Sequence, residues 1–114
     1  AKRWIVVSYD PFVGEVATFT DGDSLRHVIR TGTGKLDGVK VLHSGAIIFS
    51  SWADSSVHIL ENGRERKLIR QVPVPADIGL DTKRDRVAIP MSNVGWVQLW
   101  SLGPRETGSA SDGR

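Results

Sequence analysis

The 114-residue sequence predicts an all-β chain made of β-propeller blades, about two and a half four-stranded antiparallel units in a row. Three observations support this prediction. Short runs rich in β-branched residues alternate with turns that contain Gly, Asn or Asp. Several of these runs recur with a period of about 40 residues. No stretch keeps apolar residues at the i, i+3, i+4, i+7 spacing of an amphipathic helix.

Residues 36–70 contain one complete unit. Its four expected strands are Val39–Leu42, Ala46–Phe49, Val57–Leu60 and Lys67–Ile69. The tight turns between them are His43-Ser44-Gly45 and Asn62-Gly63, because Gly and Asn tolerate positive φ. Residues 50–56 are expected to form a longer polar connection, and the mixed charges of residues 64–67 are expected to lie in a turn. Four antiparallel strands within about 35–40 residues have the size of one propeller blade.

Parts of the same unit recur on both sides. Val6-Val7 precedes Ile47-Ile48 by about 41 residues, and Val87-Ala88-Ile89 follows Ile47-Ile48-Phe49 by about 40. The remaining strands are expected at Trp4–Ser8, Glu15–Phe19, Leu25–Arg30, Ala76–Asp81, Arg86–Ile89 and Trp96–Leu102. The repeats therefore cover residues 3–30, 36–70 and 76–102 of a propeller portion spanning 1–102. Residues 103–114, rich in Gly, Ser and charge, are expected to be a disordered tail or linker.

The first unit starts at its second strand and the last lacks its fourth, whereas a closed propeller has about 4–8 blades. We therefore expect the ring to be completed by blades from upstream sequence or by other copies of the chain. The absence of Met before Ala1 favours an upstream start.

Composition excludes several classes of function. Fifteen basic and thirteen acidic residues, mixed within turns, do not form the single-sign stripe of a nucleic-acid site. The lack of cysteine excludes disulfides and thiolate zinc sites but leaves a cytoplasmic, periplasmic or secreted location open. No apolar run reaches membrane-spanning length, so no membrane partner is expected. Thr31–Lys35 resembles a phosphate loop only superficially, since it lacks the spacer and the final Ser or Thr.

The strand order sorts the polar residues onto two rims of the expected propeller. Loops that enter a blade emerge on the same rim as the loops between its second and third strands. That rim is expected to carry Asp10, Asp37, Ser50, Ser51, Trp52, Asp54, Asp77, Ser92 and Asn93. The opposite rim is expected to carry His43, Asn62, Asp81 and Asp85.

Asp37 and Asp77 begin innermost strands, so both carboxylates are expected beside the channel mouth. Such a set suits a hard cation bound through oxygen. The alternative is that each Asp accepts backbone N–H bonds within its own turn. Trp52 is either a lid over the blade or a wall of a ligand site. A serine nucleophile at Ser50-Ser51 is not supported, because no His and acid accompany it on that rim.

Asp37-Gly38 through Trp52 resembles the SMP-30/gluconolactonase family of six-bladed propellers in its sequence of Asp-Gly, strand, turn glycine, strand and polar residue. Pro75 to Pro90 is similar to a bacterial subgroup of gluconolactonase-like proteins, and the resemblance covers Trp4 to Leu102. It implies the C-terminal portion of a six-bladed propeller. Members of that family hold one divalent metal, often Ca²⁺, with a Glu, an Asn and an Asp, and act on sugar lactones.

The resemblance assigns roles residue by residue. Asp37 matches the family's metal-binding Asp and is also the expected catalytic base, and Asp77 lies in an equivalent loop as a second candidate ligand. The Glu and Asn would come from upstream blades. Ca²⁺ is the expected metal, with Mg²⁺, Mn²⁺ and Zn²⁺ as alternatives. The expected substrate-facing residues are Ser50, Ser51, Trp52 and Asn93.

The sequence leaves three functions open. The first is a metal-dependent lactonase acting on a sugar lactone or related ester. The second is a non-catalytic propeller module that binds a protein or a saccharide. The third is an interaction-only array of blades, as in NHL-type propellers. An intact metal-binding Glu and Asn in the remaining blades would favour the first, and their absence the second.

Overall fold

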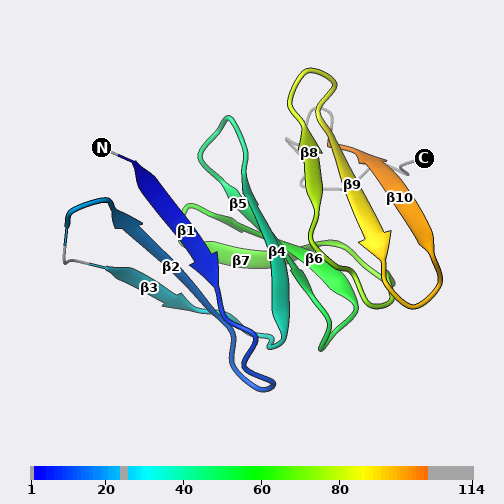
Figure 1. The fold of residues 1–114 in the computed structure, drawn as a ribbon, viewed down its shortest axis with the longest axis horizontal. Coiled ribbons are helices and arrows are strands. Elements are labelled where there is room, and N and C mark those ends of the chain that lie inside the picture. The colour runs from blue at the N-terminus through cyan, green and yellow to red at the C-terminus, as the bar shows by residue number, and fades with distance from the viewer. Residues whose placement is uncertain (1, 24–25, 103–114) are drawn as a thin grey trace.

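The computed structural model describes residues 2–23 and 26–102, and every regular element in this part of the chain is a β-strand (Figure 1). The strands are β1 (Arg3–Val7), β2 (Glu15–Thr20), β3 (His27–Arg30), β4 (Leu36–Val41), β5 (Ile47–Ser51), β6 (Ser56–Glu61), β7 (Arg64–Ile69), β8 (Gly79–Asp81), β9 (Arg86–Met91) and β10 (Trp96–Ser101). The all-β prediction is confirmed. The expected tail, 103–114, lies outside the described residues. The described part contains no helix long and apolar enough to cross a membrane.

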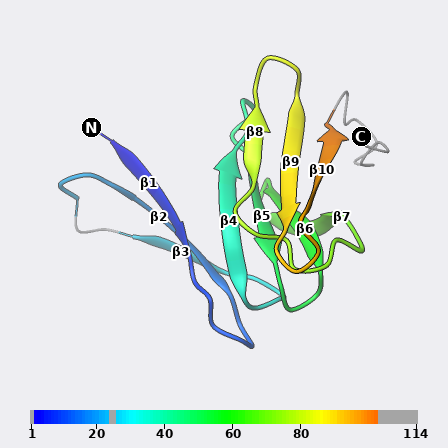
Figure 2. The ribbon, with the colours of Figure 1, turned by 45° about the vertical axis from the view of Figure 1, so that its right-hand side comes forward.

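The ten strands form three antiparallel sheets in chain order. The first sheet is β1-β2-β3, the middle sheet is β4-β5-β6-β7 and the last sheet is β8-β9-β10. Each strand pairs with its sequence neighbour, so every sheet is an up-and-down meander. Figures 1 and 2 show the middle sheet lying between the other two.

The middle sheet is apolar on both of its faces. Ile48 and Ile59 belong to a core shared with the last sheet, where they join Val87 and Ile89. Phe49, adjacent to Ile48 in β5, points to the opposite face and belongs to a second core shared with the first sheet. This alternation explains why all five residues of β5 are buried.

Several expected boundaries were wrong, for identifiable reasons. Strands β5 and β6 extend through Ser51 and back to Ser56, so the expected 50–56 connection shrinks to a turn at residues 52–55. The serines stay in the strands because their hydroxyls find internal hydrogen-bond partners. The charged run 64–67 lies in β7, since Asn62 and Gly63, with φ of 52° and 75°, complete the hairpin turn alone.

The first strand of the last sheet is shorter than expected. β8 covers only residues 79–81, whereas the sequence predicted a strand over Ala76–Asp81. Pro75 has no N–H to donate, and it makes only an isolated bridge to Met91. The Ala76 N–H donates to the Pro90 carbonyl at 2.9 Å, so the segment before β8 is held against β9 without continuous pairing.

Candidate carboxylate rim

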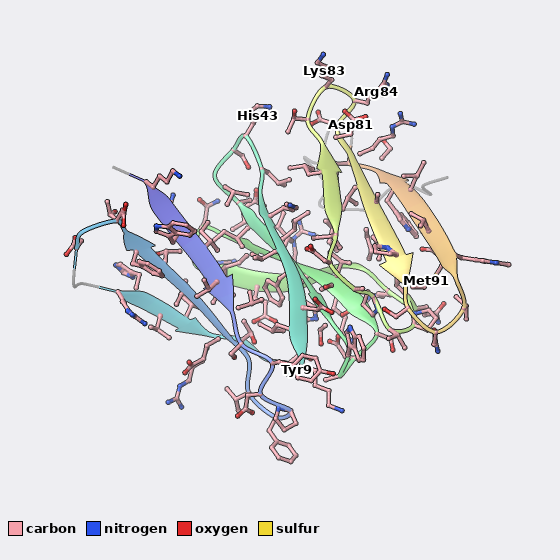
Figure 3. The ribbon with its side chains drawn as sticks, in the orientation of Figure 1. Tyr9, His43, Asp81, Lys83, Arg84 and Met91 are labelled. Carbon is pink, nitrogen blue, oxygen red and sulfur yellow. The ribbon has the colours of Figure 1, made fainter. Side chains whose placement is uncertain are left out.

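One end of the molecule gathers the candidate residues. Tyr9 in the β1–β2 loop lies at this end, whereas His43 and Asp81 lie at the opposite end (Figure 3). The β5–β6 turn and the loops leading into β4 and β8 also lie at the Tyr9 end, because the strands run up and down (Figure 1). We call this end the carboxylate rim, after Asp37 and Asp77.

Asp37 and Asp77 lie on neighbouring edge segments of the middle and last sheets. Asp37 is the second residue of β4, Asp77 lies two residues before β8, and both are exposed. Gly38, which follows Asp37 in the chain, is buried against the segment that carries Asp77. A Cβ atom on Gly38 would lie 2.5 Å from the Ile78 nitrogen and 2.9 Å from the Asp77 Cα. The missing side chain therefore lets the two backbones that carry the carboxylates approach each other.

Neither carboxylate is used to cap its own turn. Within the described residues, Asp37 and Asp77 accept no hydrogen bond and make no ion pair. Asp10 and Asp81 do cap their turns. Hydrogen bonds from the Val13 and Phe12 N–H groups lower the pKa of Asp10, and the Arg84 guanidinium lowers the pKa of Asp81. The carboxylates of Asp37 and Asp77 remain available to a ligand.

Ser50 fixes the spacing between the two carboxylate-bearing segments. Its side chain is fully buried, its oxygen accepts the Gly38 N–H at 2.8 Å, and its hydroxyl donates to the Ala76 carbonyl at 2.9 Å. Ser50 therefore connects the residue after Asp37 with the residue before Asp77. It acts from beneath the rim as a positioning residue, and its expected substrate contact stays a prediction.

Ser51 holds the loop that leads into β4. It is also fully buried, donates to the Gly34 carbonyl at 2.8 Å, and lies 2.8 Å from the Thr33 hydroxyl. Thr33 in turn is bound through its carbonyl to the Gly14 N–H of the β1–β2 loop at 2.9 Å. The two serines thus anchor the rim loops from below, and the substrate contact expected for Ser51 likewise stays a prediction.

An aromatic pair lies on the same rim. Trp52 is half-buried, and its backbone N–H donates to the Lys35 carbonyl at 3.0 Å, two residues before Asp37. Tyr9, half exposed, meets the Trp52 ring edge-to-face with centroids 5.7 Å apart. Within the described residues the buried Trp52 indole N–H has no hydrogen-bond partner. Asn93 is exposed in the β9–β10 turn.

A buried polar cluster, which we call the His58 cluster, supports the middle sheet below the rim. His58 is 4% exposed, and its Nε2 forms a 2.7 Å hydrogen bond with Asp54 Oδ2. Its Nδ1 lies 2.9 Å from Glu65 Oε2, without hydrogen-bond geometry. Its ring stacks on Phe49 with centroids 5.2 Å apart. Glu65 also accepts the Gly32 N–H at 2.9 Å. The cluster therefore connects β6, β7, the β5–β6 turn and the loop that enters the middle sheet.

The Asp54 carboxyl of this cluster has a pKa below its ordinary value. Burial opposes its ionisation, but hydrogen bonds with Ser56 and His58 outweigh burial and lower the pKa of the Asp54 carboxyl. Lys67 Nζ lies 3.7 Å from the same carboxylate. The sequence placed Asp54 on the rim, but it contained no signal that this residue pairs with His58.

The described residues do not by themselves form a complete metal site. They contain no group of three or more His, Cys, Asp or Glu side chains arranged to hold an ion. Ca²⁺ takes six to eight oxygen ligands. Asp37 and Asp77 have the right chemistry for a hard cation, but two carboxylates are too few.

Comparisons with known proteins do not assign the chain to a family. No family model, curated protein or solved structure matches the chain.

Proposed function

We propose that this chain forms consecutive blades of a β-propeller whose carboxylate rim binds a sugar lactone and, in the completed ring, hydrolyses it. The observation that carries the proposal is the Gly38 contact, which brings the exposed carboxylates of Asp37 and Asp77 to neighbouring edge segments. The propeller arrangement is supported by three successive antiparallel meanders with a middle sheet buried on both faces.

The rim offers the two kinds of group that lactone binding needs. Tyr9 and Trp52 present aromatic surface against which the apolar face of a sugar ring packs, and the carboxylates accept hydrogen bonds from its hydroxyls. In the proposed reaction, Asp37 acts as a general base and takes a proton from the water that attacks the lactone carbonyl. The ring acyl–oxygen bond of the tetrahedral intermediate then breaks, and Asp37 returns the proton to the departing ring oxygen, which gives the open hydroxy acid. Oxygen ligands beyond Asp37 and Asp77 are required before the rim accommodates Ca²⁺ or Mg²⁺, Mn²⁺ or Zn²⁺.

Asp37→Asn should lower the rate of lactone hydrolysis by about 10²–10⁴-fold, because the amide does not accept the proton. The fold should be retained, since Asp37 is exposed and its carboxylate makes no hydrogen bond within the described residues. The assay follows proton release from a six-membered aldonolactone with Ca²⁺ or Mn²⁺ present. His43→Ala, at the opposite end, is the control and should hydrolyse the lactone at the unchanged rate. Equal rates for Asp37→Asn and the unmodified chain would refute the catalytic role.

A non-catalytic binding module is the second candidate, favoured by one observation. Ser50 and Ser51 have no exposed surface, so the polar groups that reach a ligand are fewer than a hydrolase site usually presents. Calorimetry with the same lactone discriminates the two. Binding that Asp37→Asn weakens, without turnover by the unmodified chain, would favour the module.

A further inference from the structure

A cavity of about 180 Å³ lies between the middle and last sheets, at the end of the molecule opposite the carboxylate rim (Figure 3). One wall is the β4–β5 turn, which carries His43 and Ser44, and the other is the β8–β9 turn, which carries Thr82 and Asp85. The two sheets that supply these walls already pack through a shared core. Both sides of the cavity are therefore formed within the described residues.

The cavity is apolar at its floor and polar at its mouth. Leu42 and Leu102 are buried, and Leu80 is a partly buried residue packed against the same core. Ser44 and Thr82 are exposed and bring hydroxyl groups to the opening. A concave site with apolar walls and a few polar groups is the usual form of a small-molecule site.

Asp85 gives the cavity a negative charge that its own loop does not neutralise. Arg84 Nη1 lies 2.9 Å and Arg86 Nη2 3.9 Å from Asp81 Oδ2, so Asp81 engages both guanidinium groups. Lys83 lies at the tip of the loop (Figure 3). Within the described residues, the Asp85 carboxylate accepts no hydrogen bond and makes no ion pair. It is therefore available to a cation that enters the cavity.

The backbone holds Asp85 against the cavity floor. Its φ of 52° lies in the left-handed region, which Asp adopts more readily than most residues. Its carbonyl accepts the Leu102 N–H at 2.7 Å, and Leu102 is itself one of the floor residues. The loop thus fixes the carboxylate-bearing residue beside an apolar surface.

We infer that this cavity binds a small organic cation, a primary ammonium group attached to a hydrocarbon ring or short chain. The hydrocarbon part packs on the leucines of the floor. The ammonium group donates hydrogen bonds to the Asp85 carboxylate and to the hydroxyl oxygens of Ser44 and Thr82. An apolar cavity of about 150 Å³ holds a benzene molecule, so a ligand with one six-membered ring fits this volume.

The same residues disfavour other ligands. An anion would be repelled by the Asp85 carboxylate. A metal ion would meet a single carboxylate above a leucine floor, and the described residues contain no group of three or more His, Cys, Asp or Glu side chains arranged to hold one. The inference concerns the end of the molecule away from Asp37 and Asp77 and rests on neither lactone hydrolysis nor ring closure.

Titration of the isotope-labelled chain with benzylammonium chloride, followed by nuclear magnetic resonance, tests this site. The amide signals of Ser44, Thr82 and Asp85 should shift saturably, with a dissociation constant on the order of 1 mM for a ligand of about eight heavy atoms. Benzyl alcohol has nearly the same shape without the charge. It should shift the same signals but bind about 5- to 10-fold more weakly, because it cannot pair with the carboxylate.

Asp85→Asn should weaken benzylammonium binding by the same factor of about 5- to 10-fold and leave benzyl alcohol binding unchanged. The turn should be retained, because Asn also tolerates the left-handed backbone conformation. Asp21→Asn is the matched control. It removes the same charge from an exposed turn of the first sheet, which does not line the cavity, and should bind both probes as the unmodified chain does.

Three results would overturn the inference. The first is the absence of saturable shifts at the cavity when benzylammonium is raised about 20-fold above the expected dissociation constant. The second is equal affinity for the two probes, or benzylammonium binding that Asp85→Asn does not weaken. The third is a larger shift at Gly38 and Ile78, which would place the cation at the carboxylate rim. If Asp85→Asn did not fold, the comparison of the two probes on the unmodified chain would decide.

Discussion

His58→Phe should lower the free energy of unfolding by about 2–3 kcal/mol, although the replacement keeps an aromatic ring on Phe49. The imidazole separates Asp54 and Glu65, and its nitrogens lie 2.7 and 2.9 Å from their carboxylate oxygens. Without it, two carboxylates with side chains only 24% and 20% exposed face a hydrocarbon ring and each other. The expected loss is smaller than the roughly 3–5 kcal/mol for breaking a fully buried pair, since both carboxylates keep some contact with water.

Urea unfolding followed by circular dichroism measures this change in the free energy of unfolding. The dependence of that free energy on urea concentration should be the same for the variant and the unmodified chain. The matched control is His27→Phe, because His27 is an exposed strand residue of β3 and its replacement should change stability by no more than about 0.5 kcal/mol. If His58→Phe were as stable as the unmodified chain, the His58 cluster would not be holding the middle sheet together.

Gly38→Ala should also be severely destabilising, and it should lower the free energy of unfolding by about 3 kcal/mol. The added methyl group would meet the Ile78 nitrogen at 2.5 Å, the Asp77 Cα at 2.9 Å and the Ala76 carbonyl oxygen at 3.0 Å. All three are backbone atoms, so no side chain rotates away to relieve the clash. The middle and last sheets have to separate, and the Ser50 bridge from Gly38 to Ala76 breaks with them.

Gly79→Ala provides the control for this substitution. Gly79 also lies in an edge strand, β8, but a Cβ there would meet only the Ala88 Cβ, at an ordinary 3.8 Å. Thermal unfolding should place Gly79→Ala close to the unmodified chain and Gly38→Ala roughly 10 °C or more below it. Equal melting temperatures for the two variants would show that Gly38 and residues 76–78 are not in close contact.

The sequence predicts the sheets well because their signals are local. The Asn62-Gly63 turn requires only the positive φ that those two residues tolerate. The apolar run Ile47–Phe49 indicates burial on both faces without reference to the rest of the chain. Such patterns depend on neighbouring residues, so they are readable before any tertiary contact is known.

The support beneath the rim was harder to predict, because its partners are distant in sequence. Ser50 and Ser51 look like loop residues until their bonds to Ala76 and Gly34 are seen, 26 and 17 residues away. The sequence around His58 does not indicate its role, because its neighbour Glu65 lies in the next strand. Gly32, which donates its N–H to Glu65, lies 33 residues before it in the chain. A buried polar residue is predictable only together with the groups that satisfy it.

The central claim is that a ligand-binding site lies at the rim of Asp37 and Asp77, and Mn²⁺ titration followed by nuclear magnetic resonance tests it most directly. The paramagnetic ion should broaden the amide signals of Gly38 and Ile78 first, because these residues follow the two carboxylates in the chain. The signals of His43 and Asn62, on the opposite rim, should stay sharp, and Asp37→Asn should abolish the selective broadening. Broadening that begins at His43, or that is uniform along the chain, would contradict the account.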